Sequence, residues 1–163
     1  METVYLNQIE DFFKQRSIAI VGLSRDEKDY TRNLFKALRE DPRAFDLIPV
    51  NPNAEEIEGV KCYKSVLEIE KTPDAVMIFT VKASLEAIVE QCLEKGINHI
   101  WVHNNKKDSE EKDRVGKLCI EKGKNIIIDK CPFLFLEGSG FPHKVHGICL
   151  KIIGKYPSHK KDN

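Results

Sequence analysis

The segment Ser17-Ile18-Ala19-Ile20-Val21-Gly22-Leu23-Ser24-Arg25 has the pattern of a buried strand followed by a glycine turn. Residues 17–21 are rich in apolar, β-branched side chains that do not alternate with polar ones, which indicates a strand buried on both faces, as in a parallel sheet. Gly22 allows a tight turn, and the spacing of Tyr30, Leu34 and Leu38 then predicts a helix. The segment therefore predicts the first strand and helix of a parallel α/β domain.

The same alternation of strand and helix patterns continues along the chain. Short apolar segments predict four more strands, at 46–50, 74–79, 99–103 and 125–128. We expect a short helix between the second and third strands and helices around the apolar stripes at 85–93 and 115–119, which are followed by Gly96 and Gly123. The stripe Tyr5, Ile9, Phe12 and Phe13 predicts one more helix, before the first strand.

This order of elements predicts a single Rossmann-like, doubly wound α/β domain with about five parallel strands and an extra N-terminal helix. Right-handed crossovers restrict the topology, and the order 3-2-1-4-5 is our first choice for the five strands. Residues 1–157 form the domain, with the apolar side chains of 145–153 packed on it, and residues 158–163 form a frayed tail.

Composition excludes several classes of protein. The chain has 163 residues, and 26 Lys and Arg balance 26 Asp and Glu, so it lacks the basic excess of a nucleic-acid binder. No apolar run approaches the roughly 18 residues of a membrane span, and the N-terminus lacks the basic region of a secretory signal. The cysteines at 62, 92, 119, 131 and 149 are odd in number and scattered, which fits reduced thiols in a cytoplasmic protein.

Ligands of doubly wound sheets bind at the carboxyl ends of the strands, so the residues that follow each strand matter most. After the first strand, Gly22, Ser24 and Arg25 suit a phosphate, although Gly22 alone also fits a plain strand-to-helix turn. After the second strand, Asn51-Pro52-Asn53 stands where an NAD site carries an acid, and the full G-x-G-x-x-G fingerprint is absent. Both features argue against NAD and less strongly against NADP.

No pattern in the sequence predicts a reaction. There is no Walker loop and no Ser-His-Asp or Cys-His signature, and Cys131, His143, His146 and Cys149 lack the spacing of a metal site. Lys82 and Lys106 follow the third and fourth strands, where they either meet a ligand phosphate or remain solvated. The residues thus indicate a binding architecture.

The strand-end motifs resemble a known family. The segments 18–25, 48–53 and 58–63, followed by 74–79, 100–103 and 129–132, resemble the small CoA-binding proteins. These are similar to the CoA-binding domain of the succinyl-CoA synthetase α subunit and of NDP-forming acyl-CoA synthetases. The resemblance covers roughly residues 14–135, and the synthetase's phosphohistidine loop has no counterpart in it.

This resemblance implies a Rossmann-like domain that binds coenzyme A. Carried over to this chain, the cofactor-binding residues are Gly22, Leu23, Ser24, Arg25, Asn51, Pro52, Asn53, Thr80, Val81, Lys82, His103 and Asn104. The expected function is binding of CoA or an acyl-CoA by a cytoplasmic, non-catalytic or regulatory module. The alternatives are an NADP-type enzyme, a subunit of an acyl-CoA synthetase or transferase, and an interaction protein that senses a nucleotide.

Cys131 directly follows the fifth strand, beside Lys130, which favours a thiolate. In the order 3-2-1-4-5 it lies two strands from the first strand, about 10 Å away. One hypothesis is therefore that Cys131 forms a mixed disulfide with the thiol of bound CoA under oxidising conditions. The alternative is a buried, inert cysteine.

Overall fold

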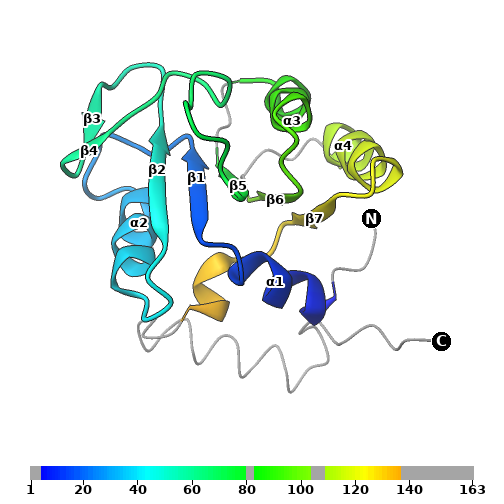
Figure 1. Ribbon diagram of the computed structural model, residues 1–163, viewed down its shortest axis with the longest axis horizontal. Coiled ribbons are helices and arrows are strands. Elements are labelled where there is room, and N and C mark those ends of the chain that lie inside the picture. Colours follow the sequence, from blue (N-terminus) through cyan, green and yellow to red (C-terminus); the bar gives the residue numbers. More distant parts are fainter. Residues whose placement is uncertain (1–4, 80–82, 104–108, 137–163) are drawn as a thin grey trace.

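The computed structural model describes residues 5–79, 83–103 and 109–136 as a sheet covered by helices on both faces (Figure 1). The sheet strands are β1 (Ser17–Val21), β2 (Asp46–Val50), β5 (Ala75–Ile78), β6 (His99–Val102) and β7 (Asn125–Ile128). The helices are α1 (Leu6–Phe13), α2 (Tyr30–Glu40), α3 (Leu85–Glu94), α4 (Ser109–Glu121) and the 3₁₀ turn η1 (Pro132–Phe135). The predicted α/β class, the five parallel strands and the N-terminal helix are confirmed.

The strand order is β2-β1-β5-β6-β7, so the predicted order 3-2-1-4-5 is wrong. The third strand, β5, pairs with β1 on the side opposite to β2. Pro49 within β2 explains the difference, since proline has no N–H for the ladder and is confined to edge strands. All four residues of β5 are buried, as the centre of a sheet requires.

Each face of the sheet carries its own apolar core. Ile18, Met77 and Trp101 point to the face covered by α1, α2 and η1, and the alternate residues Ala19, Val76 and Ile100 point to α3 and α4. Trp101 is fully buried, and its indole N–H donates to the Lys130 carbonyl at 2.8 Å.

The segment between β2 and β5 forms a β-hairpin where a short helix was predicted. Strands β3 (Glu56–Ile57) and β4 (Val60–Lys61) are antiparallel and joined by Glu58 and Gly59. Both turn residues have positive φ, +55° and +74°, as in a type I′ turn. The sequence signal for this hairpin was Gly59 between the β-branched residues Ile57 and Val60.

The topology opens a crevice at one point of the sheet edge. After β1 the chain enters α2 on one face, and after β5 it continues to α3 on the other. Doubly wound sheets bind ligands at such a switch point, which here lies between the carboxyl ends of β1 and β5. Among the described residues, no helix is long and apolar enough to cross a membrane. The predicted packing of 145–153 and the tail at 158–163 lie outside the described residues.

Candidate functional site

A cavity of about 790 Å³ lies at this switch point. Its lining includes six of the predicted cofactor-binding residues, which come from the loops after β1 and β2: Gly22, Ser24, Arg25, Asn51, Pro52 and Asn53. Apolar walls are supplied by Val21, Val50, Val66, Phe79 and Ile88. The structure thus brings two loops, distant in sequence, to one cavity.

The loop after β1 is fixed by local hydrogen bonds. Gly22 has a φ of +88°, a region that favours glycine, and its N–H donates to the Val50 carbonyl at 2.9 Å. The Ser24 N–H donates to the Thr31 hydroxyl at 3.0 Å, which in turn donates to the carboxylate of Asp29 at 2.6 Å. Asp29 also caps α2 by accepting from the Thr31 N–H, so loop and helix are tied together.

Side chains donate hydrogen bonds to the carbonyl groups of this loop. The amide Nδ2 of Asn51 donates to the Leu23 carbonyl at 2.8 Å. The Nη1 of Arg32 donates to the carbonyls of Ser24 and Arg25 at 3.4 and 3.1 Å. Within the described part of the chain, no hydrogen bond uses the N–H groups of Leu23 and Arg25. The loop therefore retains backbone donors, the groups that bind anions.

Asn51 joins the two loops. While its Nδ2 donates to the Leu23 carbonyl, its Oδ1 accepts from the Asn53 N–H at 2.8 Å. Both ends of the amide are occupied, so its role is to hold the turn after β2 against the loop after β1. An aspartate could not donate to the Leu23 carbonyl, which gives a physical reason for the amide here.

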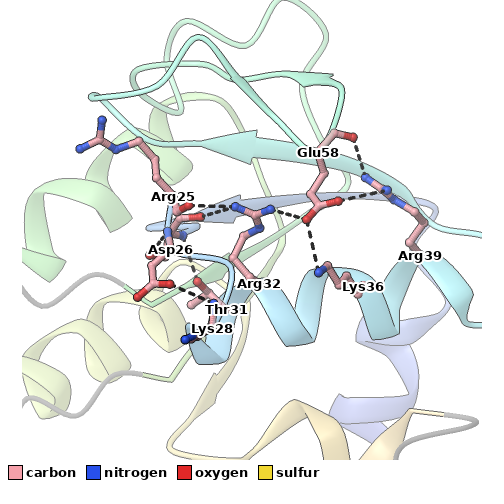
Figure 2. A network of polar contacts seen from close by, with 9 residues as sticks. Arg25, Asp26, Lys28, Thr31, Arg32, Lys36, Arg39 and Glu58 are labelled. Atoms are coloured by element: carbon pink, nitrogen blue, oxygen red, sulfur yellow. Dashed lines mark hydrogen bonds and ion pairs between the residues drawn. The ribbon is translucent and has the colours of Figure 1, made fainter.

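Two cations and two acids line the cavity: Arg25, Lys64, Asp26 and Asp29. Arg25 and Lys64 line it, both are exposed, and neither forms an ion pair with any described residue. In Figure 2 the side chain of Arg25 extends away from the neighbouring polar cluster. The acids Asp26 and Asp29 accept backbone N–H groups of their own loop, at 3.0 Å from Lys28 and 2.8 Å from Thr31.

Several predicted residues lie elsewhere. The side chain of Leu23 is completely buried in the core beside α2, and only its carbonyl takes part in the loop network. His103 does not line the cavity; its ring packs against those of Tyr30 and Phe79, with centroids 5.6 and 6.2 Å away. Burial lowers the pKa of His103 below its ordinary 6.5, so the ring is neutral at pH 7. Thr80, Val81, Lys82 and Asn104, and likewise Lys106, lie outside the described residues.

Sequence reasoning missed part of the lining: Lys64, Ser65, Val66 and, on α3, Ile88 and Gln91. Tyr63 positions residues 64–66 at the site, because its backbone pairs with β2. Its N–H donates to the Pro49 carbonyl, and its carbonyl accepts from the Asn51 N–H. The motif at 58–63 was a signal for this, since Lys64 follows it directly. For Ile88 and Gln91 there was none, because an apolar helix stripe indicates only a core contact.

Cys131 does not line the cavity and is connected to Phe79, which does, through Tyr30. Its Sγ is 3.4 Å from the Tyr30 hydroxyl, and Tyr30 packs against Phe79. Burial raises the pKa of Tyr30, which keeps the phenol neutral. Because β7 is three strands from β1, the strand ends are about 14 Å apart, more than the predicted 10 Å.

The cavity suits a ligand with phosphates and a long neutral arm. Its volume lies within the roughly 300–1,000 Å³ of small-molecule sites, its loop offers backbone donors, its lining includes two cations, and part of its wall is apolar. Fold and site together define a Rossmann-like nucleotide-binding domain.

Comparison with known proteins identifies the family. The family model described as CoA binding domain matches residues 16–137, and the chain belongs to this family. The predicted CoA-binding domain, with coenzyme A as its cofactor, is thereby confirmed.

Similar proteins include large enzyme subunits and small stand-alone domains. The chain is 30% identical to the α subunit of ADP-forming acetate–CoA ligase II of Pyrococcus furiosus, over 76% of the chain but only 28% of that subunit. It is 31% identical to the uncharacterized protein YneT of Bacillus subtilis, over 72% and 83% of the two chains. The structure of a hypothetical protein from Pyrococcus horikoshii OT3 aligns with a TM-score of 0.66 at 28% identity, covering 81% of this chain and 93% of the other.

Proposed function

We propose that this protein binds CoA or an acyl-CoA in the cavity between the carboxyl ends of β1 and β5, and that it does so without catalysis of its own. The observation that carries the proposal is the loop after β1. Its three consecutive carbonyls, at residues 23–25, accept from Asn51 and Arg32, while N–H groups of the same loop remain without a partner among the described residues. Such a loop is built to receive the pyrophosphate of the cofactor.

The composition of the cavity supports a binding role. The described lining contains no His, Cys or Glu, so neither a Cys–His nor a Ser–His pair is present among its described residues. The Asp29 carboxylate accepts hydrogen bonds from both the N–H and the hydroxyl of Thr31 at the start of α2. The matched part of the ligase subunit is only 28% of its length, so the ligase activity of that protein is not carried over to this chain.

The same likeness gives the second candidate, a CoA-binding subunit that acts together with a catalytic partner. For an NADP-dependent enzyme, the third possibility, no cation follows β2 within 51–53, where the 2′-phosphate would require one. Ligand selectivity and turnover distinguish these possibilities.

A ligand panel tests the proposal. Purified protein is melted with CoA, acetyl-CoA, NAD(H), NADP(H) and AMP, and each acyl-CoA is checked for conversion after incubation. CoA at 100 times its dissociation constant should add about 2.7 kcal/mol of stability. Stabilisation by CoA with intact acetyl-CoA is the expected result. A larger shift with NADP(H) than with CoA, or conversion of acetyl-CoA by the chain alone, would contradict the proposal.

A pair of lysine variants tests the position of the ligand. Lys64 lines the cavity, whereas Lys117 is an exposed residue on α4 that does not line it. Lys64→Ala should weaken CoA binding severalfold because it removes a cation beside the phosphates. Lys117→Ala makes the same change of charge and should leave the affinity unchanged. Equal affinities of the two variants would place the ligand elsewhere.

A further inference from the structure

Arg32 is a buried cation that connects three parts of the fold. It lies in the first turns of α2 and is only 6% exposed. Its Nη1 donates to the carbonyls of Ser24 and Arg25, and its Nη2 pairs with the carboxylate of Glu58 at the tip of the β3–β4 hairpin (Figure 2). One guanidinium group therefore spans from the hairpin to the loop after β1.

Glu58 has a backbone conformation that its residue type disfavours. Its φ is +55°, in a turn whose positions favour Asn, Asp or Gly. The carboxylate is held nonetheless, because Arg32 pairs with it, Lys36 and Arg39 lie 3.7 and 3.8 Å from it, and Arg39 also donates to the Glu58 carbonyl at 3.1 Å. The hydrogen bond from Arg32 lowers the pKa of Glu58, so the pair is ionised at neutral pH.

Neither partner lines the cavity. Their effect on a ligand must therefore pass through the loop whose carbonyls Arg32 binds. A guanidinium group has a rigid fork of donors, so its contact with Glu58 fixes the direction in which its other nitrogen points. Without Glu58 the buried guanidinium would lose its only acid partner in the described chain and would reorient toward water.

We propose that Arg32 and Glu58 are positioning residues for the CoA site, with Glu58 holding Arg32 so that the loop after β1 keeps its carbonyls bound and its N–H groups available to the ligand. The identity of the ligand as CoA rests on the proposed function, whereas the ordering of the loop by Glu58 and Arg32 does not. Preorganisation of a binding loop increases affinity because less conformational freedom is lost on binding. The hairpin thereby contributes to a site that it does not touch.

A conservative variant with a matched control tests this role. Glu58→Gln keeps the shape of the side chain and removes its charge. Glu70→Gln makes the same change in the exposed ion pair between Glu70 and Lys61, whose charged atoms are 2.8 Å apart. This pair also contacts the hairpin, through Lys61 of β4, but it does not reach the loop after β1. Glu58→Asn adds a variant whose residue type suits the turn, which separates the loss of the ion pair from damage to the hairpin.

Two measurements apply to each variant. Amide hydrogen exchange is followed in the protein without ligand, and the dissociation constant for CoA is measured by calorimetry. Glu58→Gln and Glu58→Asn should accelerate exchange on the order of tenfold at Ser24 and Asp26, the two loop amides that donate hydrogen bonds. They should leave the amides of β5 and β6 unchanged and weaken CoA binding roughly three- to tenfold. Glu70→Gln should change neither quantity.

The two proposals fail in distinguishable ways. If the wild-type protein does not bind CoA, the proposed function is wrong, and exchange at Ser24 and Asp26 still decides whether Glu58 orders the loop. Unchanged exchange there in both Glu58 variants would overturn the positioning role. Faster exchange throughout the sheet would also overturn it, because it would indicate general destabilisation. If the wild-type protein binds CoA, an unchanged CoA affinity of both Glu58 variants would overturn it as well.

Discussion

Asn51 shows how a single amide connects two binding loops. An acidic residue at this place would hold a ribose in an NAD site. Here the amide donates to the Leu23 carbonyl and accepts from the Asn53 N–H, so it serves the protein's own backbone. The sequence showed that no acid stands at position 51. It could not predict the partner of the Asn51 amide, because the Leu23 carbonyl lies 28 residues away in sequence and approaches only in the folded chain.

Asn51→Asp should therefore destabilise the fold and not create an NAD site. The change removes the donor to the Leu23 carbonyl and leaves two oxygens facing each other, at a cost of about 1–3 kcal/mol. Urea denaturation measures this cost, with the exposed Asn53→Asp as control. Equal stability of the two variants, or a gain of NAD binding by the first, would contradict this interpretation.

Cys131 should be the cysteine that reacts first with CoA disulfide. The described alternatives are buried, and burial raises the pKa of Cys92 to about 12 and of Cys119 to about 11, which suppresses their thiolates. Cys131 is only partly buried. Its thiolate would attack one sulfur of the disulfide, form the Cys131–CoA bond and release one CoA thiolate.

Mass analysis of the intact protein and its peptides checks this prediction. One CoA adduct at Cys131, absent from Cys131→Ser, is expected. First modification at Cys62, Cys92, Cys119 or Cys149, or no adduct at all, would refute it.

The β3–β4 hairpin should make the protein sensitive to acid. The pKa of the Glu58 carboxyl lies below its ordinary 4.5 because of the hydrogen bond from Arg32. Since the folded-state pKa is the lower one, the pair stabilises the fold fully above the ordinary value. The contribution is lost as the pH falls from about 4.5 through the lowered pKa.

Denaturation of the wild type and Glu58→Gln between pH 3 and 7 measures this contribution. Asp74, whose pKa is also lowered, by hydrogen bonds from Ser17, acts in the same direction in both proteins. The difference in free energy of unfolding between them should therefore shrink below about pH 4.5. A difference that stays constant over this range would show that the Glu58 charge does not stabilise the fold.

Most elements were predictable because their patterns are local. Strands β1, β2 and β7 have the predicted bounds, and the helices α1 and α3 form where their apolar stripes predicted them. The order of the strands was not predicted correctly, because it depends on which strands pair. Pro49 was the one local signal for the edge position of β2.

At the scale of the whole molecule, topology creates the site. The cavity exists because β1 and β5 are neighbours whose chains leave to opposite faces of the sheet. The predicted residues after β1 and β2 met there because the carboxyl ends of parallel strands share an edge. Lys64 and Gln91 were missed, since their arrival depends on the Tyr63 bridge to β2 and on the packing of α3.

The central claim, that CoA occupies this cavity, is tested most directly by titrating isotope-labelled protein with CoA and following the backbone amides by NMR. The account predicts saturable shifts that are largest at residues 22–26, 51, 53 and 64–66, which lie in three loop segments that contribute to the cavity lining. The amides of the far edge, at α4 and β7, should shift little. No saturable shift, or shifts centred on that far edge, would contradict the account.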